Sequence, residues 1–118
     1  MTDKSVSRIE TPFADKKYAF EMKWERIVEW EETFNKSMFG TFNEMVERRT
    51  GRASEVREII RLGLIGGGTK PTEALRLVGR YVENRPLSES VPVALEIVEA
   101  ALFGAPESEP DESTAEAA

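Results

Sequence analysis

The spacing of apolar residues changes once along this chain, and that change constrains the fold more than any other feature. Within residues 17–22 the larger apolar side chains alternate, which is the period of a half-buried β-strand. They are Tyr18, Phe20 and Met22. Residues 8–11 are a suitable antiparallel partner, with a turn near residues 14–16. From Lys23 onward the apolar residues recur at helical spacing, so the sequence predicts a small hairpin followed by helices.

Glycine, proline and polar clusters divide the rest of the chain into helices. The predicted helices cover residues 24–34, 38–49, 54–65, 71–83 and 90–103. We expect Ser37 or Thr41 to cap the second helix and Ser54 to cap the third, with Gly51 just past the end of the second. Proline is expected in the first turn of the last two helices, at Pro71 and Pro92. The predicted class is therefore α+β and predominantly helical, with an N-terminal β-hairpin and four to five short packed helices.

Apolar stripes on these helices predict which residues face the core. The stripe of the second helix is Phe39, Phe42, Met45 and Val46, that of the third is Val56, Ile59, Ile60 and Leu64, and that of the fourth is Ala74, Leu75, Val78, Tyr81 and Val82. The last helix is apolar almost all round, with Glu96 and Glu99 as its charged residues after residue 90. Such a helix lies either at the centre of the core or under a partner.

Charge and length predict one domain with an acidic tail. The chain has 118 residues and a net charge of −6. Residues 1–106 are predicted to form a single mainly helical domain that is nearly neutral, and residues 107–118 a disordered acidic tail without lysine or arginine. No run of apolar residues is long enough to span a membrane, and the first ten residues do not resemble a secretory signal, so a cytoplasmic location is expected.

The residue types present argue against catalysis. The chain contains no cysteine and no histidine, which removes thiolate metal sites, the commonest metal ligand and the commonest general base. The glycine-rich stretch 63–70 lacks the Gly-Lys-Ser/Thr order of a phosphate-binding loop and follows a helix, so we interpret it as a helix end. The glutamates fit solvated helix faces better than a paired-carboxylate site. We therefore predict no enzyme activity, no cofactor and no metal.

A basic cluster leaves a nucleic-acid interpretation open. Arg48, Arg49 and Arg52, together with Arg57 and Arg61, lie on or between two helices joined by a short turn, as in a helix-turn-helix protein. The nearly neutral body argues against this alternative, because phosphate neutralisation supplies most of non-specific DNA affinity. A small DNA-binding regulator is thus kept as a minor alternative.

Aromatic and methionine side chains are concentrated between residues 22 and 45. Such residues build the cores of small domains, and they are also enriched at the centres of protein interfaces. Two tryptophans six positions apart on a helix point about 120° away from each other, so one core does not easily receive both. The candidate partner-binding residues are Trp24, Trp30, Phe34, Met38, Phe39, Phe42 and Met45.

Several segments together resemble one family. Residues 30–37 (Trp-Glu-Glu-Thr-Phe-Asn-Lys-Ser) resemble the acidic helix, short break and serine of the gene transfer agent tail protein family, which is described both as a tail tube protein and as a tail assembly chaperone of tailed phages. Residues 61–68 resemble its apolar helix ending in Gly-Leu-x-Gly-Gly-Gly. Residues 71–78 and the Ala-rich helix 94–102, closed by Gly104, are similar to its last two helices.

The resemblance implies a non-enzymatic protein of phage-type tail assembly. Its leading implication is a tail assembly chaperone that binds the helical tape-measure protein, and also major tail tube subunits, in the bacterial host cell and then leaves the particle. The alternative that it implies is a tube-associated structural component that stays in the particle. A homo-oligomer is a further expectation, because the last helix and the aromatic residues offer apolar surface.

Overall fold

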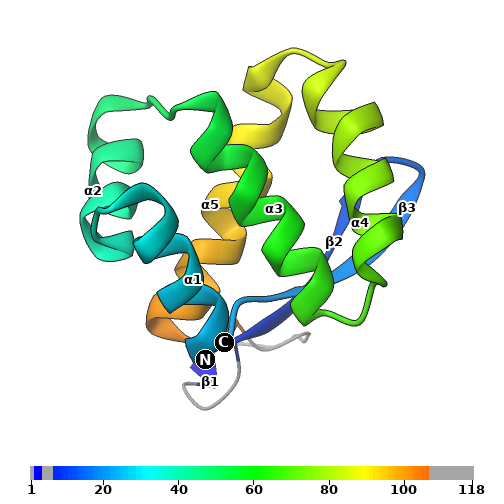
Figure 1. The fold of residues 1–118 in the computed structure, drawn as a ribbon. Helices are drawn as coiled ribbons and strands as arrows, with labels where there is room; N and C mark the ends of the chain where they lie inside the picture. The colour runs from blue at the N-terminus through cyan, green and yellow to red at the C-terminus, as the bar shows by residue number, and fades with distance from the viewer. Residues whose placement is uncertain (1, 4–6, 107–118) are drawn as a thin grey trace, which may run out of the picture.

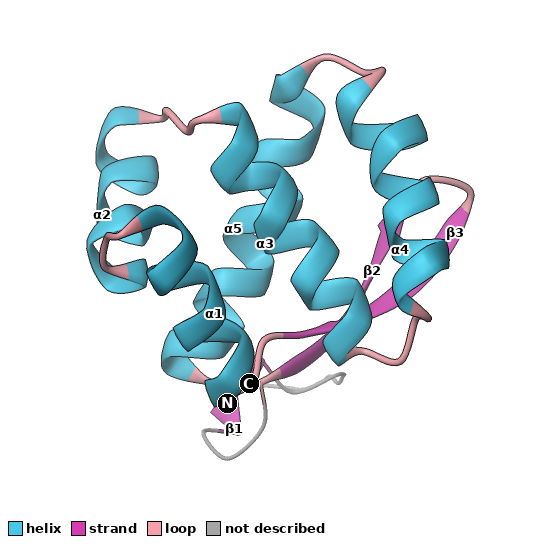
Figure 2. Ribbon diagram, viewed as in Figure 1, coloured by secondary structure: helices cyan, strands magenta, loops and turns pink. Residues whose placement is uncertain are grey.

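A two-stranded hairpin lies beside five α-helices in the computed structural model, which describes residues 2–3 and 7–106 (Figures 1 and 2). The predicted α+β, mainly helical class is confirmed. The predicted acidic tail, residues 107–118, lies outside the described residues.

The predicted hairpin is confirmed in both its pairing and its turn. Strand β2 (Arg8–Phe13) pairs antiparallel with β3 (Lys16–Glu21), and the turn contains Ala14 in the left-handed region at φ 61°. Phe20 is fully buried, and its ring centroid lies 5.8 Å from that of Phe13 across the hairpin. A second short pair, β1 (Thr2–Asp3) with β4 (Ala105–Pro106), brings the two ends of the described chain together.

The first two helices, α1 (Trp24–Phe34) and α2 (Met38–Arg48), are joined by a tight turn. Asn35 takes the left-handed conformation at φ 54°, and the Ser37 hydroxyl accepts a hydrogen bond from the Gly40 amide at 3.0 Å. Ser37 is thus the cap of α2. Thr41, the other predicted cap, lies instead in the first turns of the helix and is buried.

The turn into helix α3 (Ala53–Gly66) corrects two predictions. The residue in the left-handed region after α2 is Arg49, at φ 51°, and not Gly51. Glycine at position 51 is explained by packing and not by backbone conformation, since a Cβ atom there would lie 3.0 Å from a methyl group of Val56. Ser54 is not the N-cap, because α3 begins one residue before it and Arg52 occupies the cap position without a side-chain hydrogen bond.

Helix α3 is the centre of the fold. It packs against α1, α4, α5 and β3, with α1 and α4 on opposite sides of it in Figure 1. Every residue of its predicted stripe is buried, and burial extends around the helix: Val56, Ile59, Ile60, Leu62, Gly63 and Leu64. A helix covered on so many sides cannot present a long face to solvent.

The glycines that end α3 meet the backbone of β3. A Cβ atom added to Gly66 would overlap the carbonyl oxygen of Glu21, and one added to Gly67 would overlap that of Ala19. Both glycines have right-handed or helical backbone conformations, and Gly68 alone among the three takes positive φ, at 113°. The helix end was predicted correctly, but close approach of two backbones, rather than conformational freedom, requires the first two glycines.

The last two helices were predicted, but their bounds differ from the prediction. Helix α4 (Pro71–Val78) begins with Pro71 as predicted and continues as a π-helical turn, η1 (Gly79–Glu83). Helix α5 (Leu87–Phe103) starts three residues earlier than predicted, so Pro92 lies inside it and not in its first turn. The earlier start is supported by partial burial of Leu87 against the core and by the bonds of Arg85 to Glu89.

Two predicted stripes are partly wrong. On α2 the core-facing residues are Met38, Thr41, Phe42 and Met45, whereas Phe39 and Val46 are exposed. On α4 the buried residues are Ala74, Leu77 and Val78, whereas Leu75 is 63% exposed. Helix α5 does belong to the core of this chain, through Ala94, Ile97, Val98 and Ala100.

Candidate partner-binding surface

The candidate partner-binding residues divide by burial. Trp30, Met38 and Met45 are in the core, at 0–2% exposure. Phe34 and Phe42 are half-buried and pack against that core. Trp24 is 78% exposed and Phe39 48% exposed. Of the seven candidates, these last two therefore offer the most surface to a partner.

The two tryptophans of α1 differ because of helix geometry. Trp30 points inward, donates a hydrogen bond from Nε1 to the carbonyl oxygen of Glu55 at 3.3 Å, and lies 5.0 Å from the Phe34 ring. Trp24 is six residues earlier, which rotates it about 120° around the helix axis and away from the core. The expectation that one core does not receive both is confirmed.

Helix α5 adds a third exposed aromatic residue, Phe103. Its ring centroid lies 5.4 Å from that of Phe39 and 5.6 Å from that of Phe42. Phe103 also lines a depression of about 540 Å³ together with Trp24, Met22 and Ile27. We call the surface formed by Trp24, Phe39 and Phe103 the aromatic face.

Sequence reasoning missed Phe103 although a signal was present. The residue belongs to a helix that is apolar almost all round, so its exposure was not recognised. Yet Pro92, Glu96, Glu99 and Phe103 recur at intervals of four, three and four, and all four are exposed. The two charged members mark the solvent side of the helix, and Phe103 continues their stripe.

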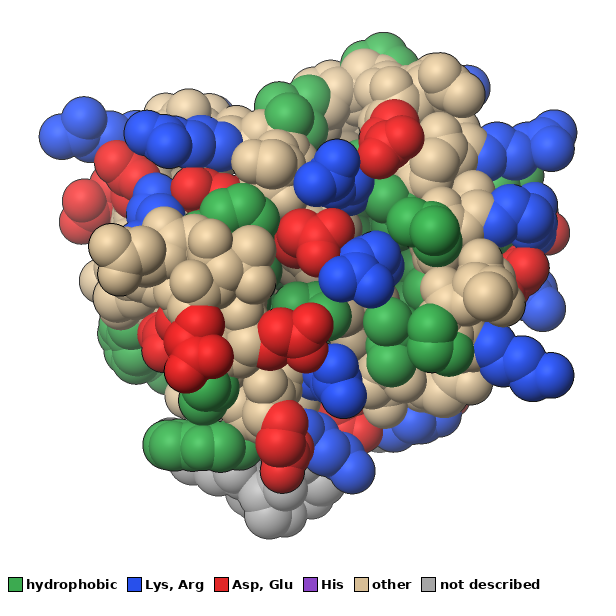
Figure 3. Space-filling view, viewed as in Figure 1, with side chains coloured by type: hydrophobic (Ala, Val, Ile, Leu, Met, Phe, Trp, Pro, Cys, Tyr) green, Lys and Arg blue, Asp and Glu red, His purple; other side chains and the backbone are tan. Residues whose placement is uncertain are grey.

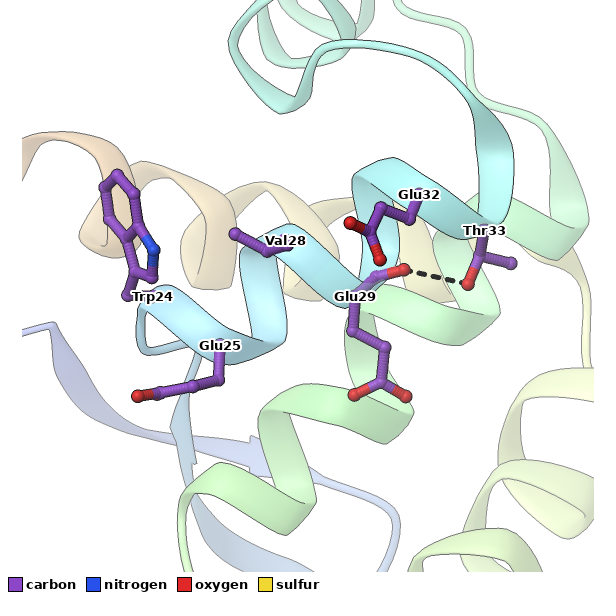
Figure 4. A pocket seen from close by; sticks show the side chains of 6 residues that line it. All are labelled: Trp24, Glu25, Val28, Glu29, Glu32 and Thr33. Carbon is purple, nitrogen blue, oxygen red and sulfur yellow. Dashed lines mark hydrogen bonds between the residues drawn. The ribbon is translucent and has the colours of Figure 1, made fainter.

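Acidic side chains border the aromatic face along α1 (Figure 4). Trp24 and Val28 extend from one side of the helix, and Glu25 and Glu29 extend from the other. Glu32 lies about one helical turn after Val28. These residues and Thr33 line a shallow depression of about 510 Å³. Helix α1 carries four glutamates and one arginine, and α5 carries three glutamates and no basic residue. The α1 flank of the apolar surface thus carries negative charge, whereas Lys23 lines the depression that Trp24 and Phe103 share.

Residues 30–37, which resemble a segment of the tail protein family, form the end of α1 and the turn into α2. The Glu31 carboxylate accepts a hydrogen bond from the Met38 amide at 2.8 Å, at the start of α2. Lys36 forms an ion pair with the buried Glu55 carboxylate at 3.2 Å. Trp30 joins α1 to α3 through its hydrogen bond to Glu55, and Ser37 caps α2. The segment therefore fixes the angle between two helices and thereby the position of the aromatic face.

The helix-turn-helix interpretation does not fit this arrangement. The second helix of such a motif inserts into the major groove, whereas α3 is surrounded by other elements. Arg61 is bonded to Glu58 at 2.7 Å, and this hydrogen bond raises the pKa of its guanidinium above the usual value. Arg57 pairs with Glu83 at 3.3 Å. These arginines are already neutralised within the chain.

Within residues 2–3 and 7–106 there is no cluster of three or more acidic, histidine or cysteine side chains that is arranged to hold a metal ion. In the same part of the chain, no helix has both the length and the apolar character that crossing a membrane requires.

The geometry defines a small helical domain whose distinctive surface is a patch of exposed aromatic residues with acidic side chains along α1. The chain matches the family model described as "Phage tail tube protein, GTA-gp10" over residues 7–104. It therefore belongs to this family, as the resemblance predicted, and has a tail-related role. No curated protein and no solved structure matches the chain.

Proposed function

We propose that this protein is a structural component of a phage-type tail, associated with the tube and retained in the particle. The observation that carries the proposal is the family match over residues 7–104, which names a tail tube protein and covers nearly the whole described domain. This supports the structural alternative over the assembly chaperone that led the sequence analysis. We further propose that the protein acts by binding and not by catalysis, because its sequence contains neither histidine nor cysteine.

The aromatic face is the surface that we assign to tail partners. Exposed tryptophan and phenylalanine side chains supply much of the binding energy at protein interfaces when a partner removes them from water. Trp24 is too exposed to contribute much to the stability of the monomer, and about half of the Phe39 side chain faces solvent. Their surface is therefore available for contacts between tail subunits.

Composition of purified particles tests the proposal. Quantitative mass spectrometry of intact particles should find this chain at a fixed, stoichiometric ratio to the major tube protein. Particles purified from a strain lacking the gene provide the control for carry-over. Absence of the chain from intact particles would contradict the structural role.

An assembly chaperone is the second candidate, and the exposed aromatic face favours it specifically. An apolar patch on a helical body is suited to bind the apolar stripe of an amphipathic helix, such as those of a tape-measure protein. Co-expression should then keep the tape-measure protein soluble and the two should co-purify, while particles lack the chain. Trp24→Ala should reduce this co-purification.

A further inference from the structure

The outer edge of strand β2 has no neighbouring strand among the residues that the structure describes. β2 pairs with β3 on one side, whereas β1 and β4 form a separate sheet. β4 lies close to β2, but no backbone hydrogen bond joins the two within residues 2–3 and 7–106. Alternate residues of β2 are exposed: Arg8, Glu10 and Pro12. The hairpin thus leaves an open sheet edge beside the helices (Figure 2).

The contact between α3 and β3 shows which backbone groups face the open edge. A Cβ atom added to Gly66 would overlap the carbonyl oxygen of Glu21 but lie 2.9 Å from its carbonyl carbon, so this carbonyl points toward α3 and away from β2. Glu21 is opposite Arg8, and both members of an antiparallel pair that is not hydrogen-bonded direct their N–H and C=O groups outward. The direction repeats at every second residue. The N–H and C=O groups of Arg8 and Glu10 therefore point to the open edge.

Two opposite charges are neighbours on this edge. Arg8 and Glu10 are exposed, while Ile9 between them packs against the core. Neither charged residue has an ion-pair partner within the described part of the chain, and the Arg8 guanidinium donates a hydrogen bond to the carbonyl oxygen of Gly67 at 3.3 Å. On the face drawn in Figure 3, acidic and basic side chains are interspersed, so no broad region of one charge selects a partner on that face. At a sheet edge, a local pattern of two charges is enough to favour one register.

We propose that the β2 edges of two copies of this chain pair antiparallel around a two-fold axis at Ile9 and form a four-stranded sheet. In this register Arg8 of each copy is opposite Glu10 of the other, and the two pairs of residues exchange four backbone hydrogen bonds. Charged residues on an edge strand often prevent pairing with other chains. Here the two-fold symmetry brings opposite charges together twice, and cross-strand pairs of this kind stabilise a sheet.

The neighbouring registers are unfavourable, so the edge specifies one arrangement. A shift toward the hairpin turn places Glu10 opposite Glu10 of the second copy and Arg8 opposite Pro12, which has no N–H to donate. A shift in the other direction places Arg8 opposite Arg8. This inference goes beyond the proposed function, and it can fail without affecting it, because dimerisation of the purified chain and particle composition are separate measurements.

Amide hydrogen exchange of the full chain, measured over a range of protein concentrations, locates the contact. In the monomer the amides of Arg8 and Glu10 have no backbone partner among the described residues, so their protection should rise with concentration as the edges pair. The amides of Ile9 and Thr11 face β3 in both states and are the internal control. Constant exchange at Arg8 and Glu10 up to the highest soluble concentration would overturn the proposal, even if the chain associates through another surface.

Charge reversal tests the register. Arg8→Glu and Glu10→Arg each bring like charges together at both ends of the contact. The dissociation constant of the dimer, measured by sedimentation equilibrium, should therefore rise about tenfold in each variant. Both positions are exposed, so both variants should fold like the unmodified chain. The double variant restores opposite charges and should dimerise like the unmodified chain, and an equimolar mixture of the two single variants should form heterodimers.

Lys17→Glu is the matched control, because it reverses the same charge at an exposed position of β3, away from the open edge. It should dimerise like the unmodified chain, and added salt should weaken both equally. Single variants that dimerise as well as the unmodified chain would contradict the register and with it the proposal. So would a double variant and a mixture that both fail to recover dimerisation.

Discussion

Two regions of the molecule use their unusual residues in opposite ways. At the end of α3, Gly66 and Gly67 touch the backbone of β3 so closely that no side chain fits. At the aromatic face, Trp24, Phe39 and Phe103 remain 43–78% exposed although they are among the largest apolar residues of the chain. Packing accounts fully for the first region and leaves the second without an explanation inside the monomer.

This difference teaches how to separate structural from binding residues within one segment. Residues 22–45 supply both the core, through Trp30, Met38 and Met45, and the exposed face, through Trp24 and Phe39. Similar residue types therefore have two roles that only their direction distinguishes. Substitutions that compare matched positions can test the division.

The largest expected effect is at Trp30. Trp30→Ala removes a fully buried ring and its hydrogen bond to Glu55, so the free energy of unfolding should fall by about 3–5 kcal/mol. Trp24→Ala on the same helix should change it by no more than about 0.5 kcal/mol. Urea denaturation followed by circular dichroism measures both. Equal losses at the two positions would contradict the division.

The next effect is at the glycine contact. Gly66→Ala places a methyl group on the Glu21 carbonyl, so α3 or β3 must shift, at a cost of about 3 kcal/mol. Gly40→Ala, where the nearest atom to an added Cβ is 3.6 Å away, should instead stabilise α2 by about 0.5–1 kcal/mol. Thermal unfolding of both variants should show shifts of opposite sign. A stable Gly66→Ala protein would show that the junction tolerates a wider separation.

A smaller effect is expected at Thr41, on the buried side of α2. Its Oγ1 atom is buried and has no hydrogen-bond partner among the described residues. Thr41→Val removes the unpaired hydroxyl at nearly constant volume and should raise the free energy of unfolding by about 1 kcal/mol. Thr41→Ser keeps the hydroxyl and loses a methyl group, so it should lower that free energy by about 0.8 kcal/mol. A destabilised valine variant would indicate that the hydroxyl is paired.

The smallest effect is on titration of Glu73, on the α4 side of the molecule. Hydrogen bonding to Arg76 lowers the pKa of this carboxyl below its ordinary value. Since the pKa of Glu73 is lower in the folded than in the unfolded chain, the ion pair adds to the free energy of unfolding above the unfolded pKa. This contribution is lost as the pH falls through the folded pKa. NMR titration should find a low midpoint, and Arg76→Gln should restore an ordinary one. Glu89, whose pKa is lowered by Arg85, should be unchanged in that variant and is the internal control.

Much of the fold was predictable because it depends on local chemistry. Alternation at residues 18, 20 and 22 predicted the hairpin, and the breaks at Asn35 and at Gly66–Gly68 were placed correctly. Errors occurred where the burial of a side chain depends on the elements that pack against its helix. Leu75 belongs to an apolar stripe by spacing, yet it is exposed because the buried side of α4 is formed by Ala74, Leu77 and Val78.

The candidate surface was predictable only in part. The sequence located the aromatic segment, and the spacing of its two tryptophans gave the angle between them. It did not identify Phe103, which lies about sixty residues later on α5 and packs against Phe39. The residues Trp24, Phe39 and Phe103 meet because α1, α2 and α5 converge at one end of the fold. Their role in binding stays a prediction that the variants above test.

The sequence alone determined the elements, because period, glycine and proline act within a few residues along the chain. It also determined the family, through segments whose order extends over most of the domain. Only the tertiary structure showed which aromatic residues belong to the core and which to the surface. It also showed that close contact with the β3 backbone requires two consecutive glycines at the end of α3. The physical reason is that burial and close backbone approach depend on which elements pack together, and those partners are distant in the sequence.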